Sequence, residues 1–249
     1  MQEKIKMGNL VGVLHKPNVK SSHGVVMVHG FGGEGLALEF TDVAKSLSKK
    51  GFAVLRFLFS GYETGDLTKL TVSNEIRELK SAIDFLEMRG VTKIALVAQS
   101  LGCAVSILLN DPRVNAMALL APGTNLRAWP LREFGTHKIQ ELEKFGKIAV
   151  TTRSSGKVNI GVGFWTEIKN ISAIPMAQIK KIKCPLLIIY GTNDKTFELK
   201  EYEQLFRLAN EPKELIVIKG VGHVTIKEGK FRKEIIQLIT EFFSKFLNA

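Results

Sequence analysis

Short apolar runs of strand length alternate along the chain with longer amphipathic stretches. The runs that we expect to form strands are Leu10–Leu14, Gly24–Val28, Ala53–Phe57, Lys93–Ala98, Ala116–Leu120, Leu186–Tyr190 and Leu215–Ile218. Several are unbroken apolar tracts, which is typical of strands buried on both faces of a parallel sheet. The stretch Glu3–Met7, which precedes Gly8-Asn9 and Leu10–Leu14, predicts an antiparallel hairpin at the edge of that sheet.

Helix-length stretches with one apolar face lie between these runs. The expected helices are Leu36–Lys50, Val72–Arg89, Leu101–Asn110, Phe197–Ala209 and Lys230–Leu247. Gly51 and Gly90 follow two of them, as glycine commonly does at helix ends, and Pro112 stops a third. The alternation predicts an α/β fold with a mostly parallel central sheet flanked by helices on both faces.

The alternation breaks after the sixth strand, where residues 123–182, approximately, show no clear strand–helix repeat. Because a long stretch of this kind is uncommon inside an α/β domain, we expect it to be an inserted cap or lid. The alternative is a surface excursion with no role. We expect residues 1–249 to form a single domain that includes the insert. The aromatic residues that could cover a substrate pocket from the insert are Trp129, Phe134, Phe164 and Trp165.

The composition suits a globular protein with a basic surface. Hydrophobic residues make up 45% of the chain, which is enough for a sizeable core. The 35 Lys and Arg residues outnumber the 24 Asp and Glu residues, giving a net charge of +11. The basic residues are spread along the chain, and no zinc-finger or RNA-binding pattern accompanies them. We therefore expect no nucleic-acid partner.

The N-terminus and the cysteines point to a cytoplasmic protein. The first residues lack the apolar core of a signal peptide, and the longest apolar runs are well short of the roughly 18 residues of a membrane span. We therefore expect no membrane association. Cys103 and Cys184 are most simply reduced, buried thiols, although a disulfide between them stays open.

Ser100 is the candidate nucleophile. It lies in Ala98-Gln-Ser-Leu-Gly102, between a predicted buried strand and a predicted helix. A serine at such a turn has a strained backbone, and small residues two positions before and after it let the strand and helix approach closely. Ala98 stands where the pattern G-x-S-x-G has its first glycine. The alternative is that Ser100 only caps the following helix.

A glycine-rich loop, His29-Gly-Phe-Gly-Gly33, follows the predicted strand Gly24–Val28. Its glycines let backbone N–H groups turn inward, so the N–H groups of Phe31 and Leu101 can form an oxyanion hole. Such donors are aimed at the charge that develops on a carbonyl oxygen. We expect His29 to brace this loop and not to act as a base.

An acid and a base follow two later strands. Asp194 ends Tyr190-Gly-Thr-Asn-Asp, and His223 ends Gly220-Val-Gly-His. The carboxyl ends of parallel strands share one sheet edge, so both side chains can reach Ser100. Each residue has a purely structural alternative. Asp194 could serve only to form a turn or cap a helix, and His223 could be an exposed loop residue without a role. Glu198 and Asp66 are rival acids, but neither follows a strand so directly.

The three candidate residues occur along the chain in the order Ser, Asp, His, which is the order found in α/β-hydrolases. In these motifs and this order, the sequence resembles the α/β-hydrolase superfamily of serine esterases. The resemblance extends from about Lys4 to Phe246. The sequence is most similar to compact esterases of the cinnamoyl and feruloyl esterase type, with dienelactone-hydrolase-like and acyl-peptidase-like proteins as relatives. The segment Arg56-Phe-Leu-Phe-Ser-Gly resembles the R-F-D-F-x-G of these esterases. Leu58 replaces the usual Asp there, and Tyr62-Glu63 replaces a frequent His-Gly.

The resemblance implies an α/β-hydrolase fold in which Ser100 attacks, His223 acts as base and Asp194 orients it. The implied substrate is a small ester with a small or aromatic acyl group, cleaved through an acyl-enzyme. An amide or acyl-peptide hydrolase is one alternative, and a non-catalytic binding protein with this fold is another. We expect no metal or organic cofactor, since no clustered ligand spacing is visible. A homodimer is compatible with the sequence.

Overall fold

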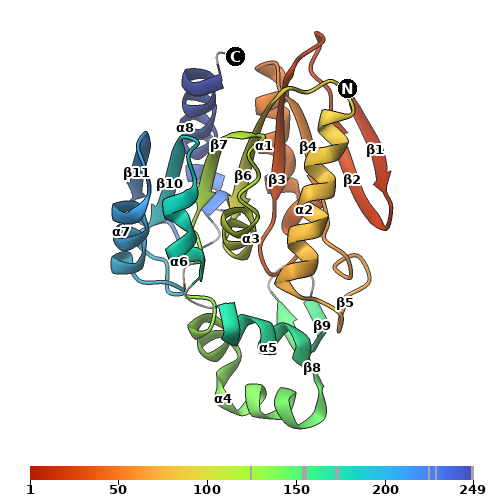
Figure 1. The fold of residues 1–249 in the computed structure, drawn as a ribbon, viewed down its shortest axis with the longest axis vertical. Coiled ribbons are helices and arrows are strands. Elements are labelled where there is room, and N and C mark those ends of the chain that lie inside the picture. Colours follow the sequence, from red (N-terminus) through yellow and green to blue (C-terminus); the bar gives the residue numbers. More distant parts are fainter. Residues whose placement is uncertain (124, 153–155, 172–173, 224, 228, 248–249) are drawn as a thin grey trace.

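The computed structural model describes residues 1–123, 125–152, 156–171, 174–223, 225–227 and 229–247. Within this part of the chain an eight-stranded sheet has the order β1-β2-β4-β3-β6-β7-β10-β11 (Figure 1). Its strands are β1 Gln2–Met7, β2 Leu10–His15, β3 His23–Val28, β4 Ala53–Phe57, β6 Lys93–Gln99, β7 Val114–Leu120, β10 Leu186–Gly191 and β11 Lys213–Ile218. Strand β2 pairs antiparallel with β1 and with β4, and the other neighbours are parallel. The predicted parallel sheet and edge hairpin are confirmed.

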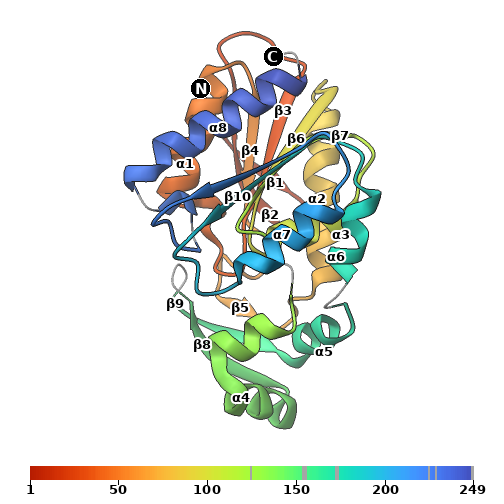
Figure 2. The same ribbon diagram turned by 90° about the vertical axis from the view of Figure 1, so that its left-hand side faces the viewer.

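Helices cover both faces of this sheet (Figure 2). One face carries α1 (Leu38–Lys49) and α8 (Gly229–Leu247), and the other carries α2 (Val72–Glu87), α3 (Leu101–Leu109) and α7 (Leu199–Leu208). Side chains alternate between the faces along each strand. In β3, Val25 and Met27 pack with the core under α1 and α8, while Val26 and Val28 pack with the opposite core. The predicted layers are therefore present.

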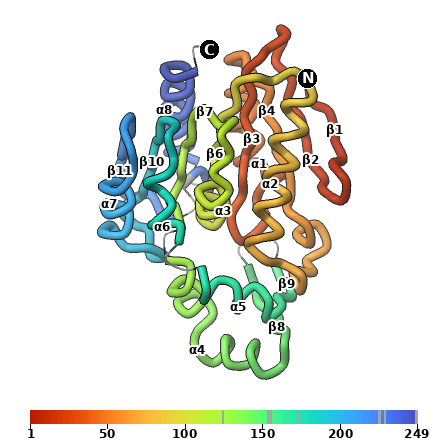
Figure 3. Tube along the Cα trace, viewed as in Figure 1, coloured from red at the N-terminus to blue at the C-terminus, as the bar shows by residue number. Residues whose placement is uncertain are grey.

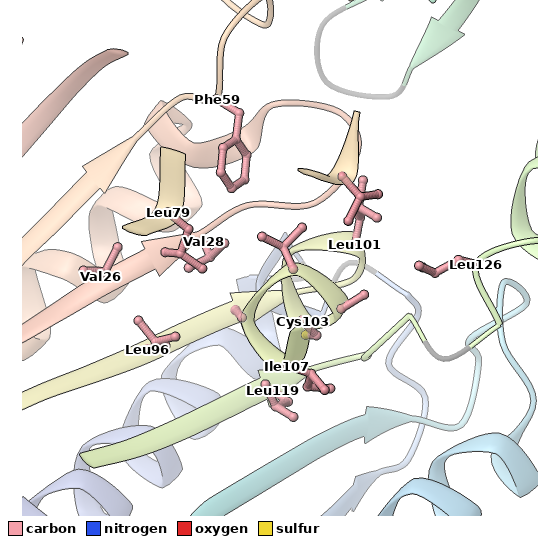
Figure 4. Packing of buried hydrophobic residues seen from close by; sticks show 14 of the residues in the cluster. Val26, Val28, Phe59, Leu79, Leu96, Leu101, Cys103, Ile107, Leu119 and Leu126 are labelled. Carbon is pink, nitrogen blue, oxygen red and sulfur yellow. The ribbon is translucent and has the colours of Figure 1, made fainter. Parts of the chain in front are cut away.

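Helix α3 is buried along most of its length, from Leu101 to Ile107. Its side chains lie among those of β3, β6 and β7, including Val28, Leu96 and Leu119 (Figure 4). Close packing of this kind leaves little room for rearrangement. The helix that follows Ser100 is therefore held rigidly against the centre of the sheet.

The chain leaves the main sheet after β7 and returns to it at β10 (Figure 3). The elements in between are α4 Ala128–Phe145, β8 Lys147–Thr152, β9 Gly156–Gly161, α5 Val162–Ile171, α6 Ile174–Gln178 and the 3-10 helix η2 Ile179–Lys181. The sequence shows no clear strand–helix repeat here, but the segment contains two strands that were not predicted. Strands β8 and β9 pair antiparallel, and together with β5 (Asp66–Leu67) they form a second, three-stranded sheet. Two further 3-10 helices are η1 Glu34–Leu36 and η3 Thr225–Lys227.

We call α4, β8, β9 and α5 the insert. It lies beyond the carboxyl ends of the parallel strands (Figure 1) and is fixed to the loop after β4. Strand β5 of that loop pairs with β9, and a Cβ atom at Gly161 would lie only 2.0 Å from the carbonyl oxygen of Thr68. The hydroxyl and backbone N–H of Ser73, in the first turn of α2, both donate to Glu167 of α5. These contacts hold the insert over one end of the sheet.

The two cysteines are free thiols. Cys103 is fully buried on α3, and burial raises the pKa of its thiol, as expected for a small core residue. Cys184 is only partly buried, contrary to the expectation of two buried thiols. Among the helices in the described ranges, none is long and apolar enough to cross a membrane.

Candidate active site

Four loops converge at the carboxyl ends of β3, β6, β10 and β11. Ser100 follows β6, Asp194 follows β10, and His223 follows β11. The imidazole of His223 joins the other two side chains. Its Nε2 lies 2.8 Å from Ser100 Oγ, and its Nδ1 lies 2.8 Å from Asp194 Oδ2. The structure thus brings the three predicted side chains into one hydrogen-bonded row.

Ser100 has a backbone conformation that residues other than glycine rarely adopt, with φ 51° and ψ −118°. Such a strained residue persists only where its surroundings hold it. Its N–H donates to the carbonyl of Leu120 at 3.0 Å, and its carbonyl accepts from the N–H of Gly123 at 3.1 Å. Ser100 precedes α3, but its side chain makes no capping hydrogen bond. The hydroxyl points at His223 instead, so simple helix capping does not describe this serine.

The turn at Ser100 requires a glycine two residues later. A Cβ atom at Gly102 would lie 2.5 Å from the carbonyl oxygen of His29 and 2.7 Å from that of Val28. At Gly30, a Cβ atom would lie 2.9 Å from the Cβ of Ser100. The loop after β3 therefore runs directly against the serine. Ala98, which departs from the usual glycine, is completely buried in the core between β6 and its neighbours.

Asp194 is a buried carboxylate with several donors. Besides His223, the hydroxyl of Tyr202 donates to Oδ2 at 2.7 Å, and the N–H groups of Thr196 and Phe197 donate to Oδ1 at 2.7 and 3.2 Å. Burial alone would raise the pKa of Asp194. The hydrogen bonds from His223, Tyr202 and Thr196 outweigh burial and hold this pKa below its ordinary value. Asp194 is therefore both a turn residue and the partner of His223.

Tyr202 is a site residue that the sequence reasoning missed. It lies on α7 and has no exposed surface, and its ring centroid is 4.3 Å from that of Tyr190. In the sequence it is one more apolar position on an amphipathic helix, and nothing distinguishes its hydroxyl from that of any other buried tyrosine. Only the packing of α7 against β10 places that hydroxyl on Asp194.

The rival acids are engaged elsewhere. Glu198 forms a capping box with Glu201 at the start of α7 and pairs with Lys200. Asp66 is exposed and accepts hydrogen bonds from Thr68. Neither carboxylate contacts His223.

His29 makes two hydrogen bonds within the loop after β3. Its Nδ1 lies 2.8 Å from the carbonyl oxygen of Gly30 and donates to it, while its Nε2 accepts from the N–H of Phe59 at 3.0 Å. Burial lowers the pKa of His29 to about 4, so the ring is neutral at pH 7. These contacts are those of a residue that braces the loop.

A small cavity of about 50 Å³ adjoins Ser100 and His223. Phe31 from the main body and Trp129 and Phe134 from the insert line it. The other two aromatic candidates do not line this cavity. Phe164 stacks on Phe31, with ring centroids 5.8 Å apart, so it packs against a residue of the cavity wall without lining the cavity itself. Trp165 is buried in the core and donates its indole N–H to Glu143 at 2.8 Å.

The side chains of the described residues form no cluster of three or more His, Cys, Asp or Glu that could hold a metal ion.

The sequence of the chain matches a known family. The chain belongs to the α/β hydrolase family, which it matches over residues 25–229. It is 25% identical over 237 residues to "Putative esterase/lipase 2" of Mycoplasma pneumoniae, with 84% of each chain covered. It is also 25% identical over 236 residues to Esterase EstD of Thermotoga maritima, with 83% of this chain and 55% of EstD covered.

Solved structures share this fold at low sequence identity. Est1E from Butyrivibrio proteoclasticus superposes with a TM-score of 0.79 and 16% identity, covering 100% of this chain and 99% of Est1E. The monoacylglycerol lipase of Paleococcus ferrophilus superposes with a TM-score of 0.76 and 17% identity, covering 96% of this chain and 99% of that lipase. The predicted α/β-hydrolase fold is thereby confirmed.

The close approach at Gly102 generates a stability prediction. We expect Gly102→Ala to lower the free energy of unfolding by about 2 kcal/mol or more, because the new methyl group meets backbone oxygens that cannot move aside. Gly163→Ala is the matched control, since Gly163 is also the second residue of its helix but its added Cβ would meet only the Thr71 methyl group, at 3.8 Å. Urea denaturation at pH 7 measures both. A Gly102→Ala variant as stable as the parent chain would contradict the clash.

The hydroxyl of Tyr202 generates a pH-dependent prediction. The folded pKa of Asp194 lies below its unfolded value, so the carboxylate stabilises the fold above the unfolded pKa, and this stabilisation is lost as pH falls through the folded pKa. Tyr202→Phe removes one donor and raises the folded pKa. We expect it to lower the free energy of unfolding at pH 7 by about 1–3 kcal/mol. The difference should narrow as the pH falls below about 4.

The control for Tyr202→Phe is Tyr190→Phe. Tyr190 packs on the Tyr202 ring, but its hydroxyl makes no hydrogen bond to any described residue. We expect its loss to have a small effect that does not change with pH. Denaturation of the three proteins between pH 3 and 7 compares them. An equal destabilisation by Tyr202→Phe at every pH would show that its hydroxyl does not act through the charge of Asp194.

Proposed function

We propose that this protein is a serine hydrolase that cleaves carboxylic esters of small acyl groups through an acyl-enzyme intermediate. The observation that carries the proposal is the 2.8 Å contact between His223 Nε2 and the hydroxyl of Ser100, a serine held in a strained turn beside a cavity. A nucleophile within hydrogen-bond reach of a base that is itself oriented by a third group has the geometry needed for acyl transfer. The names of two relatives, which are described as esterases or lipases, support the same class of reaction.

Each member of the row has one role in the proposed reaction. Ser100 Oγ attacks the ester carbonyl carbon as His223 Nε2 takes its proton. The proton then passes from Nε2 to the leaving alcohol oxygen, the carbon–oxygen bond of the ester breaks, and the acyl group stays on Ser100. A water molecule, deprotonated by His223 Nε2, then attacks the acyl carbon. The bond between that carbon and Ser100 Oγ breaks, the proton passes from Nε2 to Oγ, and the acid is released. Asp194 accepts the hydrogen bond from Nδ1 and stabilises the imidazolium in both halves of the reaction.

The backbone N–H groups of Phe31 and Leu101 are the proposed oxyanion donors. The loop that carries Phe31 runs directly against the nucleophile, since a Cβ atom at Gly30 would lie 2.9 Å from the Cβ of Ser100 and 3.6 Å from the N atom of Leu101. The two contacts of His29 fix the backbone of this loop. Donors that are fixed before the reaction stabilise the tetrahedral intermediate without reorganisation.

The size of the cavity supports a small acyl group. A volume of about 50 Å³ is well below the roughly 300–1,000 Å³ of pockets that enclose drug-sized ligands. Trp129 and Phe134 narrow the space from the side of the insert, where Trp129 has its ring centroid 5.0 Å from that of Phe31. The insert thus acts as a lid that limits the length of the acyl chain.

The role of Ser100 is tested by its removal. We expect Ser100→Ala to lower kcat for p-nitrophenyl butyrate by at least about 10⁴-fold, with little change in the melting temperature, because the hydroxyl makes no capping bond. Ser106→Ala is the control, since Ser106 is buried on the same helix and donates to Gly102 away from the cavity. Turnover retained in Ser100→Ala would refute the nucleophile. An active parent enzyme that hydrolyses matched anilides as fast as esters would instead favour the amide-hydrolase alternative.

The role of the lid is tested by a chain-length series of p-nitrophenyl esters. We expect kcat/KM to be highest for acetate or butyrate and to fall for octanoate, because the cavity cannot enclose the longer chain. Trp129→Ala removes part of the wall and should raise the octanoate-to-butyrate ratio of kcat/KM. Trp165→Ala is the matched control, since Trp165 is also a buried tryptophan of the insert but does not line the cavity. An equal change of this ratio in both variants would mean that Trp129 does not limit chain length.

A further inference from the structure

Arg132 of the insert reaches across to the loop that carries Asp194. It lies on α4, three residues after Trp129, so the two side chains are neighbours on the surface of that helix. Trp129 lines the cavity at Ser100, whereas Nη1 of Arg132 donates to the carbonyl oxygen of Thr196 at 2.9 Å. None of the reaction steps given above uses this contact.

The carbonyl that Arg132 contacts belongs to the same peptide group as a donor to Asp194. This peptide joins Thr196 to Phe197, and the N–H of Phe197 donates to Asp194 Oδ1 at 3.2 Å. A peptide group is planar, so a bond that fixes its oxygen also fixes its N–H. A charged donor on the oxygen polarises the group as well, which strengthens the hydrogen bond from its N–H. Arg132 and Asp194 are thus linked through one peptide.

Phe197 connects the same peptide with the base. Its side chain is buried, and its ring centroid lies 5.5 Å from that of His223. A shift of this peptide would therefore disturb both a hydrogen-bond donor to Asp194 and a ring that packs beside His223.

Two carboxylates of α7 lie beside the guanidinium of Arg132. Glu198 Oε1 is 3.6 Å from Nη2, and Glu201 Oε2 is 3.9 Å from Nη1. Both carboxylates belong to the capping box at the start of α7. Such partly exposed ion pairs contribute little by themselves, but they favour a position of the guanidinium over this loop. The contact with a defined direction is the hydrogen bond to Thr196.

The part of α4 that carries Arg132 is set off from the rest of the helix. Gly135 has φ 81° and ψ 156°, so the helical conformation is interrupted there. The part before it also carries Trp129 and Phe134, which line the cavity. One short helical segment therefore supports both a wall of the cavity and the contact to Thr196.

We propose that Arg132 is a positioning residue, which aligns Asp194, and through it His223, when the insert covers the cavity. This inference rests on the proposed function. Asp194 stabilises the imidazolium only while its carboxylate is held in line with Nδ1, and a small misplacement of an active-site group lowers the rate by a large factor. The insert then contributes to turnover itself, besides limiting the length of the acyl chain.

The test compares Arg132→Met with Lys138→Met. Lys138 is also a cation of α4, but it pairs with Glu141 of the same helix at 2.7 Å. We expect Arg132→Met to lower kcat for p-nitrophenyl acetate and butyrate by about tenfold each, with KM nearly unchanged, and Lys138→Met to keep the parent values. A residue that only held the lid would instead raise the octanoate-to-butyrate ratio of kcat/KM, as expected for Trp129→Ala, without loss of kcat. That outcome would overturn the proposal.

Asp194→Asn decides whether Arg132 acts through the carboxylate. Residues that act as a unit have non-additive effects on the rate. In the Asp194→Asn background, measured at high enzyme concentration, we expect Arg132→Met to lower the residual kcat by less than about twofold. A loss of about tenfold in both backgrounds, or no loss in either, overturns the proposal. Arg132→Ala removes the same group from the helix and gives the same cycle if Arg132→Met does not fold.

The parent enzyme separates the role of Arg132 from the proposed function. If it cleaves the esters through Ser100 but Arg132→Met behaves like Lys138→Met, only the role of Arg132 is wrong. If the parent enzyme cleaves no ester and a fluorophosphonate does not label Ser100, the proposed function fails and the role of Arg132 fails with it.

Discussion

The backbone of Ser100 is held at φ 51° and ψ −118°, and the rest of the site depends on that turn. The strain is tolerated because the residues on both sides are fixed. Strand β6 lies in the middle of the sheet, and α3 is buried from Leu101 to Ile107. Hydrogen bonds to Leu120 and Gly123 close the turn from the neighbouring strand. A rigid core thus presents one hydroxyl at the sheet edge, where loops from three other strands can reach it.

The second constraint is the buried negative charge of Asp194. Asp194 loses its hydration, and hydrogen bonds from His223, Tyr202 and two backbone N–H groups replace it. This fixes the position of the carboxylate, and through it the orientation of His223. The other histidine near the site, His29, is buried as a neutral ring that holds the loop carrying Phe31. The two histidines therefore differ in their hydrogen-bond partners.

Most of the fold could be predicted from the sequence, because strands buried on both faces have unbroken apolar runs and because Gly and Pro mark the helix ends. The three side chains of the row were also predictable, since each follows a strand and such residues share one edge. Strands β8 and β9 were missed because the polar stretch around Thr151 and Lys157 lies within the adjoining ends of both strands, so neither has an unbroken apolar run. Tyr202 could not be predicted, because its importance depends on the hydrogen-bond partner that packing gives to its hydroxyl.

The central claim is that Ser100 is the activated nucleophile of this chain. The most direct measurement is site mapping by mass spectrometry after brief reaction of the folded protein with a fluorophosphonate, with His223→Ala and heat-unfolded protein as comparisons. The account predicts one phosphonyl group per folded chain, located on Ser100, and strongly slowed labelling in both comparisons. Labelling of a different residue, or equal labelling of folded and unfolded protein, would contradict it.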